Sequence, residues 1–256
     1  MAGIPATAFL VLALFAGLAR AEPPPVIAAA SSLRFALADI AQAFKVQTGL
    51  SVRLSFGSSG NMARQIAQGA PYQMFLSADE TYVRDLAAAG YLIDGGKVYA
   101  HGRLALFRAK GSPLRSVKFP GGFRAAFAEP RVHRLALANP AHAPYGRAAK
   151  QALVYAGLWD IVEPSLVYGE NVSQAAQFAA SGSADGGLIA YSLALKLKRS
   201  GKGDLSLVPA DWHRPLGQRM ALVKGAGQTA AKFYAFLSTR KARTLLSQHG
   251  FMEAGP

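Results

Sequence analysis

Four short segments of the chain place small or hydroxyl-bearing residues where a strand is expected to give way to a helix. They are residues 29–33 (AASSL), 56–61 (FGSSGN), 139–146 (NPAHAPYG) and 168–173 (YGENVS). The start of a helix exposes unpaired N–H groups and carries a partial positive charge. Serine hydroxyls add donors and glycine lets a ligand approach the backbone, so each segment is a candidate oxyanion site.

Helix capping is the simpler interpretation of each segment taken alone, because serine and asparagine are common N-cap residues. The turn Ser58-Ser59-Gly60 is the strongest of the four candidates. Pro144 is typical of a helix start and places the Tyr145 and Gly146 amides in a first turn. Residue spacing alone does not establish that the four segments meet at one point.

Short apolar runs alternate with helical stretches along the whole chain. Residues 26–30 predict a strand, and apolar residues then recur at helical spacing as far as Thr48, where Gly49 ends the helix. Further strands are expected at residues 50–56, 73–76, 104–107, 134–138, 166–168, 187–190 and 205–208, and further helices at 61–68, 81–89, 146–157, 172–181, 229–237 and 242–249. This alternation predicts an α/β fold whose sheets are mostly parallel, and ligands of such sheets bind beyond the carboxyl ends of the strands.

The amino terminus reads as an export signal. Residues 6–18 form an apolar run that is shorter than the roughly 20 residues a bilayer span needs. Ala19-Arg20-Ala21 follows as a cleavage site, so residues 1–21 are predicted to be a signal peptide and the mature protein to be exported and soluble.

Composition excludes several kinds of chemistry. The 256 residues include no cysteine, which rules out disulfide frameworks, cysteine-ligated metal centres and thiol catalysis. Gly57-Ser58-Ser59-Gly60 does not match the G-x-S-x-G of a nucleophilic serine, no histidine lies in the serine segments, and the histidines show no metal-site spacing. Asp79 is expected to cap a helix rather than to act as an acid. We therefore expect no catalytic residues, no metal ligands and no cofactor.

The chain is strongly basic, with 28 Lys+Arg against 14 Asp+Glu and a formal net charge of +14. Removing Arg20 with the signal peptide leaves 27 basic and 14 acidic residues, a charge of +13. The densest basic groups, residues 196–202 and 240–243, have no interleaved aromatic residues for base stacking, so we expect no nucleic-acid partner. Positive charge does raise the local concentration of small anions.

The sequence resembles the periplasmic molybdate-binding proteins of bacterial molybdate ABC importers. The matching stretches run from residue 26 to 190, and the rest matches in pattern through residues 249–251, so the resemblance covers nearly the whole mature chain. Its most specific motifs are residues 69–79 (GAPYQMFLSAD) and 139–146 (NPAHAPYG). It implies a two-lobed solute-binding fold whose chain crosses between the lobes twice, with the anion in a cleft at the hinge. Residues 22–102 with 206–256 would form the first lobe, and residues 103–205 the second.

The resemblance also implies a function. It predicts a periplasmic monomer that binds molybdate, and tungstate with it, through hydrogen bonds and passes it to an inner-membrane ABC permease with its ATPase. The family's binding positions fall on Ser31, Ser32, Ser59 and the amides of Tyr145 and Val172. Some members add a tyrosine hydroxyl near the last strand. Here that position is Ala190, and because neighbouring residues of a strand face opposite ways we expect Tyr191 not to be a ligand.

Two other functions stay open at this point. Molybdate at neutral pH is a dianion without a proton to donate, so its site needs donors only, but sulfate and thiosulfate make the same demand and differ in size. A binding protein for sulfate, thiosulfate or another small anion is therefore the first alternative. An exported hydrolase of phosphate or sulfate esters is the second, and it would need a general base in the cleft.

Overall fold

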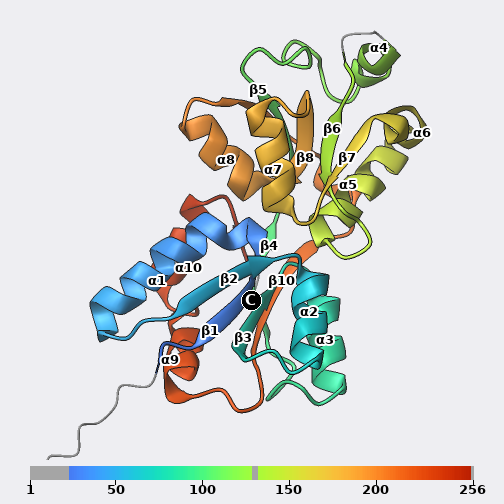
Figure 1. Ribbon diagram of the computed structural model, residues 1–256. Coiled ribbons are helices and arrows are strands. Elements are labelled where there is room, and N and C mark those ends of the chain that lie inside the picture. Colours follow the sequence, from blue (N-terminus) through green and yellow to red (C-terminus); the bar gives the residue numbers. More distant parts are fainter. Residues whose placement is uncertain (1–22, 129–131, 255–256) are drawn as a thin grey trace, which may run out of the picture.

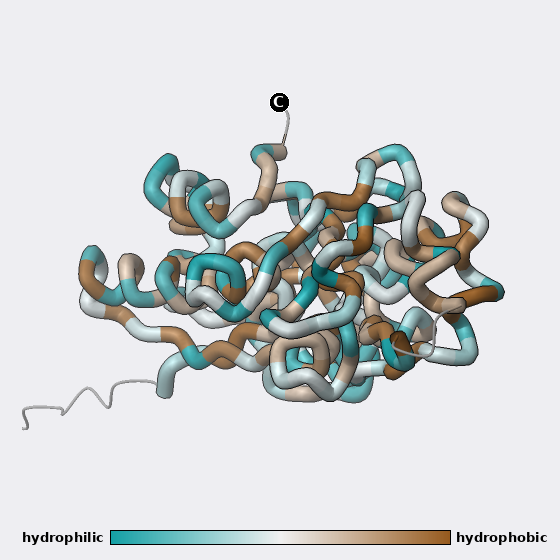
Figure 2. The backbone as a smooth tube through the Cα atoms, turned by 90° about the horizontal axis from the view of Figure 1, so that it is seen from above, coloured by the Kyte–Doolittle hydropathy of each residue, from teal (hydrophilic) through white to brown (hydrophobic). Residues whose placement is uncertain are grey.

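Two lobes, each built on its own mixed sheet, make up the part of the chain that this computed structural model describes, residues 23–128 and 132–254 (Figure 1). The predicted signal peptide lies outside those residues. None of the helices in those residues combines the length and the hydrophobicity that a bilayer span requires. Hydrophobic and hydrophilic residues are instead interspersed along the chain, as expected of helices and strands that bury one face (Figure 2).

The sheet of the first lobe has the strand order β11-β4-β10-β3-β1-β2 within the described residues. Its strands are β1 (Val26–Ala30), β2 (Arg53–Gly57), β3 (Tyr72–Ser77), β4 (Lys97–Gly102), β10 (Leu216–Leu222) and β11 (Met252–Glu253). Its helices are the short 3-10 helix η1 (Ser31–Leu33), α1 (Arg34–Thr48), α2 (Ser59–Ala67), α3 (Glu80–Ala88), α9 (Gln228–Phe236) and α10 (Arg240–Gln248). In Figure 1, α2 and α3 cover one face and α1, α9 and α10 the other.

The sheet of the second lobe has the order β7-β6-β8-β5-β9 within the described residues. Its strands are β5 (Leu104–Ala109), β6 (Leu135–Ala138), β7 (Leu166–Gly169), β8 (Gly186–Ala190) and β9 (Gly203–Leu207). Its helices are α4 (Phe123–Ala128), α5 (Pro144–Tyr155), α6 (Trp159–Val162), α7 (Val172–Ser181), α8 (Tyr191–Arg199) and the 3-10 turn η2 (Glu163–Ser165). A further turn, η3 (Ala210–Trp212), lies on the return path to the first lobe.

The chain crosses between the lobes where β4 passes into β5 through Arg103, and again between β9 and β10. Ser206 and Leu207 pair with β5, so the second crossing follows Leu207 rather than lying between residues 205 and 206 as predicted. The prediction of mostly parallel sheets was also wrong. The pairs of β1 with β2 and β3, and of β6 with β7 and β8, are parallel, whereas β4, β5 and β10 pair antiparallel with their neighbours.

Helix α1 shows why the sequence folds as it does locally. Leu37, Ile40 and Phe44 recur at helical spacing and are buried, and Gly49 ends the helix in the left-handed conformation at φ 73°. Phe44 on the buried face meets Phe233 and Phe236 of α9 edge to face, with ring centroids 5.2 and 5.5 Å apart. This packing fixes α1, and with it η1, against the sheet of the first lobe.

Candidate oxyanion-binding site

The four segments singled out in the sequence all lie where a strand leads into a helix. The first junction joins β1 to η1 and the second joins β2 to α2, both in the first lobe. The third joins β6 to α5 and the fourth joins β7 to α7, both in the second lobe. Helix α2 begins at Ser59, two residues before the predicted start, because serine and glycine are weak helix formers that the periodicity does not reveal.

Contacts across the interlobe boundary connect the first junction to the fourth. The backbone N–H of Ser173 donates to Ser31 Oγ at 3.2 Å, and the Ser173 hydroxyl donates to the carbonyl oxygen of Ser31 at 2.9 Å. All four atoms belong to buried residues. The start of α7 is thereby held directly against η1 of the opposite lobe.

The second junction touches both junctions of the other lobe. The Gly60 N–H donates to the carbonyl oxygen of His142 at 3.0 Å, and His142 Nδ1 lies 2.9 Å from Ser58 Oγ. A Cβ atom on residue 60 would lie only 2.7 Å from the His142 oxygen, so this approach requires glycine. Towards the fourth junction, Asn61 Nδ2 donates to Glu170 Oε1.

The first and third junctions meet at the hinge. The Tyr145 phenol is buried beside the Ser32 hydroxyl. Burial raises the pKa of Tyr145 well above its usual range, and Ser32 opposes that rise. A Cβ atom on Gly102, the last residue of β4, would lie 2.2 Å from Tyr145 Oη, so only glycine leaves room for the phenol there. Each junction thus contacts two others, so the four junctions form a closed ring of contacts across the boundary between the lobes, called the enclosure below.

All five predicted binding residues belong to the four junctions and are at most 4% exposed: Ser31, Ser32, Ser59, Tyr145 and Val172. Whether they bind an anion stays a prediction. Their hydroxyls are arranged as donors. Ser59 Oγ accepts the N–H of Ala78 at 3.0 Å and Ser31 Oγ accepts that of Ser173, so each hydroxyl proton remains available to an acceptor.

Ser32 Oγ is a buried hydroxyl without a regular hydrogen-bond partner among the described residues. The backbone of Ser32 is held in place, because the Ser192 hydroxyl donates to the Ser32 carbonyl oxygen at 2.8 Å. Leaving a buried hydroxyl unsatisfied costs about 1–3 kcal/mol. A ligand that accepts a hydrogen bond in the enclosure would remove this cost.

Three backbone amides in the first turns of helices are also free to donate to a ligand. In the described residues, the N–H groups of Ser59, Tyr145 and Val172 have no acceptor, as expected of first-turn positions. Asn171 caps α7 by accepting from Ser173 and Gln174, which leaves the Val172 amide free. Pro144 has no N–H, so Tyr145 supplies the first amide of α5.

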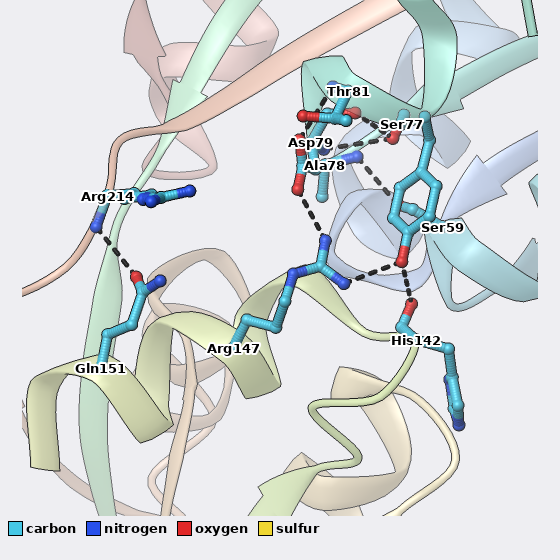
Figure 3. A network of polar contacts seen from close by, with 10 residues as sticks. Ser59, Ser77, Ala78, Asp79, Thr81, His142, Arg147, Gln151 and Arg214 are labelled. Atoms are coloured by element: carbon cyan, nitrogen blue, oxygen red, sulfur yellow. Dashed lines mark hydrogen bonds and ion pairs between the residues drawn. The ribbon is translucent and has the colours of Figure 1, made fainter. Parts of the chain in front are cut away.

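Arg147, a basic residue two positions after Tyr145, is engaged by other side chains. Its Nη2 donates to Asp79 Oδ2 at 2.6 Å (Figure 3), and its Nη1 donates to the Tyr82 hydroxyl at 2.8 Å. Asp79 caps α3 as predicted, since its Oδ1 accepts the Thr81 N–H at 2.9 Å. Burial alone would raise the pKa of Asp79, but the bonds from Thr81 and Arg147 outweigh burial and lower it. The carboxylate therefore stays ionised and paired.

Two site features were missed from the sequence. His142 comes from the other lobe to meet Ser58, so a histidine does lie beside the serines, and Glu170 Oε2 is 3.6 Å from its Nε2. The Ser58–His142 contact joins residues 84 positions apart in different lobes, and His142 and Glu170 belong to two different strand-to-helix junctions of the second lobe, so no local pattern reveals either contact. Ser173 was also missed. It follows the helix cap Asn171, so the sequence suggests only a local role at the start of α7 and not the contact with Ser31.

Tyr191 is the first residue of α8, and its ring lies against the C-terminal segment. A Cβ atom on Gly250 would lie 2.8 Å from that ring, and the Tyr191 N–H donates to the Arg103 carbonyl at 2.8 Å. This position supports the expectation that Tyr191 is not a ligand. No group of three or more histidine or acidic side chains suited to a metal ion occurs among the described residues.

Comparisons with known proteins agree with the geometry. The family model for bacterial extracellular solute-binding proteins matches residues 25–252. The molybdate-binding protein ModA of Rhodobacter capsulatus is 35% identical over 94% of each chain. The structure of the Azotobacter vinelandii periplasmic molybdate-binding protein superposes with a TM-score of 0.82 at 30% identity, covering 90% of this chain and all of that one. The Mycobacterium tuberculosis sulfate-binding protein SubI shares the fold, with a TM-score of 0.75 at 18% identity over 92% of this chain and 88% of that one. The chain therefore belongs to the bacterial extracellular solute-binding protein family, and the molybdate-binding proteins are among its relatives in it.

Proposed function

We propose that this protein binds molybdate, and tungstate with it, in the enclosure between the four junctions. The observation that carries the proposal is the donor set: three buried hydroxyls and three first-turn amides, with protons or N–H groups that the described residues leave free. A lining of donors suits an anion that has no proton of its own. The 35% identity to a molybdate-binding relative supports the same choice of ligand.

The donor set is large enough for tight binding. Hydrogen bonds to charged groups contribute about 1.5–3 kcal/mol each, so six such bonds contribute about 9–18 kcal/mol. Association costs at least about 4 kcal/mol in lost freedom. The remainder covers the range from micromolar to nanomolar dissociation constants, which corresponds to about 8–12 kcal/mol. No cation on the anion is needed, and an ion pair there would carry its own desolvation cost.

The biological role follows from the family. The protein would act as the periplasmic component that hands its anion, as a monomer and without catalysis or cofactor, to an inner-membrane ABC permease with its ATPase. The predicted signal peptide over residues 1–21 supports export, and the solute-binding family supports the partnership with a transporter.

Sulfate and thiosulfate are the closest rival ligands, because they too need only donors. A thermal-shift panel with molybdate, tungstate, sulfate, thiosulfate and phosphate separates them, since a ligand that binds only the folded protein raises its stability by mass action. We expect the two larger oxyanions alone to give large shifts at micromolar concentration. A larger shift with sulfate or thiosulfate would reassign the ligand.

One observation favours the second alternative, an exported hydrolase. Ser58, His142 and Glu170 form a serine–histidine–carboxylate series, with 2.9 Å between Ser58 Oγ and His142 Nδ1 and 3.6 Å between His142 Nε2 and Glu170 Oε2. Ser58 is only 4% exposed, and its partners belong to the other lobe, so the series exists only where the lobes touch. We expect no turnover of aryl esters, phosphates or sulfates. Turnover that disappears in Ser58→Ala would establish the hydrolase instead.

A further inference from the structure

Arg147 connects the two lobes beside the enclosure without belonging to the donor set. It lies in the first turn of α5, two residues after Tyr145, and its guanidinium reaches the start of α3 in the first lobe. The group donates to Asp79 and Tyr82, and its central carbon lies 5.1 Å from the centre of the Tyr82 ring. Figure 3 shows the side chain extending from α5 towards Asp79.

The contacts continue from Arg147 to the site itself. The Tyr82 hydroxyl donates to the His142 carbonyl at 3.4 Å, the same oxygen that accepts the Gly60 N–H. On the other side, Asp79 directly follows Ala78, whose N–H donates to Ser59 Oγ. Arg147 therefore joins the start of α5, which presents the Tyr145 amide, to the segments that orient Ser59.

The ion pair between Arg147 and Asp79 should contribute more stabilising free energy than an ion pair exposed on the surface. The Arg147 and Asp79 side chains are 33% and 28% exposed, and the carboxylate divides its oxygens between capping α3 and accepting Arg147. Partly buried, charge-assisted hydrogen bonds of this geometry exceed the small contribution of exposed pairs. The two charges cancel, so the pair adds no net attraction for a dianion.

We propose that Arg147 is a positioning residue that holds the lobes together over the bound anion, through Asp79 and Tyr82, and so slows its release. Its contacts exist only where the start of α5 meets α3, so they stabilise the closed lobes with or without an anion and are absent while an anion enters between open lobes. The inference rests on the proposed function for its main readout, which is the release of molybdate. It assigns no contact between Arg147 and the anion.

The test compares dissociation rates of molybdate by stopped-flow tryptophan fluorescence in wild type, Arg147→Gln and Asp79→Asn. Asparagine caps helices as well as aspartate, so Asp79→Asn removes the charge while keeping the cap. Arg84→Gln is the matched control, because Arg84 pairs with Glu80 at 2.9 Å within α3 and contacts only its own lobe in that pair. We expect Arg147→Gln and Asp79→Asn each to raise the dissociation rate of molybdate about 5- to 10-fold, with an association rate within about twofold of wild type.

The double variant Arg147→Gln, Asp79→Asn should release molybdate no faster than either single variant, since both remove the same contact. An unchanged dissociation rate in Arg147→Gln would overturn the proposal. Arg147→Gln that binds molybdate more slowly, with an unchanged dissociation rate, would also overturn the proposal, because Arg147 would then act by attracting the anion before it binds. Either outcome leaves the proposed function intact, whereas wild type that fails to bind molybdate refutes the function itself.

A second readout needs no ligand. The native chain has no cysteine, so the pair Asn61→Cys and Glu170→Cys, whose native side chains meet across the boundary, can be cross-linked by a short bifunctional thiol reagent. Without anion, adding Arg147→Gln should slow this cross-linking severalfold and adding Arg84→Gln should not. Equal rates in all three backgrounds would show that Arg147 does not hold the lobes together.

Discussion

Replacement of Ser59 by alanine separates the two bonds that its hydroxyl can make. The hydroxyl oxygen accepts the Ala78 N–H at 3.0 Å in a fully buried position, and its proton is free for an anion. Loss of the acceptor leaves the Ala78 N–H buried and unpaired, which costs about 1–3 kcal/mol of the free energy of unfolding with or without ligand. Loss of the donor affects the anion complex alone.

The expected loss of affinity follows from the donor. A hydrogen bond to a charged group contributes about 1.5–3 kcal/mol, so Ser59→Ala should raise the dissociation constant of molybdate about 10- to 150-fold. Isothermal titration calorimetry measures this constant, and circular dichroism with thermal denaturation confirms that the variant is folded. Ser112→Ala is the control, since Ser112 Oγ likewise accepts a backbone N–H, that of Leu114 at 3.0 Å, and its hydroxyl donates to the Asp185 carbonyl, away from the four junctions.

The control should lose stability and keep its affinity, whereas Ser59→Ala should lose both. Folded Ser59→Ala that binds molybdate within about twofold of wild type would refute the assignment of Ser59 to the anion. Equal losses of affinity in Ser59→Ala and Ser112→Ala would show that the effect comes from general destabilisation.

Three further outcomes are expected. Because Ser32 Oγ has no regular hydrogen-bond partner among the described residues, Ser32→Ala should leave the melting temperature of the ligand-free protein unchanged or raise it. Its affinity for molybdate should fall about 10-fold or more, and a lower melting temperature would be the contrary result. Tyr191→Phe should bind molybdate within about twofold of wild type in calorimetry, since its ring lies against Gly250, and a larger loss would place its hydroxyl on the anion. The lowered pKa of Asp79 means that ionised Asp79 contributes stability that is complete above about pH 4 and lost as the pH falls through the folded-state pKa. Urea unfolding should therefore show the stability gap between wild type and Asp79→Asn at pH 6 shrinking as the pH falls towards 2.5, and a constant gap would be the contrary result.

Local signals predicted the elements that carry the junctions. The strand at residues 26–30, the helix end at Gly49 and the helix over residues 172–181 agree with β1, α1 and α7, because apolar periodicity and capping residues act within a few residues of one another. The hinge strands β4 and β10 were missed. They pair antiparallel with each other across more than a hundred residues, and Gln218 interrupts the register between them.

The arrangement of the site could be predicted only in part. Serines at helix starts indicate donors, but only the fold brings Ser31 to Ser173 and Ser58 to His142 from opposite lobes. The sequence likewise gives no sign that Arg147 pairs with Asp79, 68 residues away, rather than facing solvent or the anion. Interlobe contacts depend on how the two sheets are oriented against each other, and the residue spacing within either sheet does not predict that orientation.

The most direct measurement is a crystal structure of the mature protein with tungstate, whose anomalous scattering locates the metal atom of the anion. The account predicts one tungsten peak between the lobes, with its oxygens within hydrogen-bonding distance of the Ser32 and Ser59 hydroxyls and the Tyr145 and Val172 amides. A peak outside the four junctions, or one held directly by a lysine or arginine side chain, would contradict it.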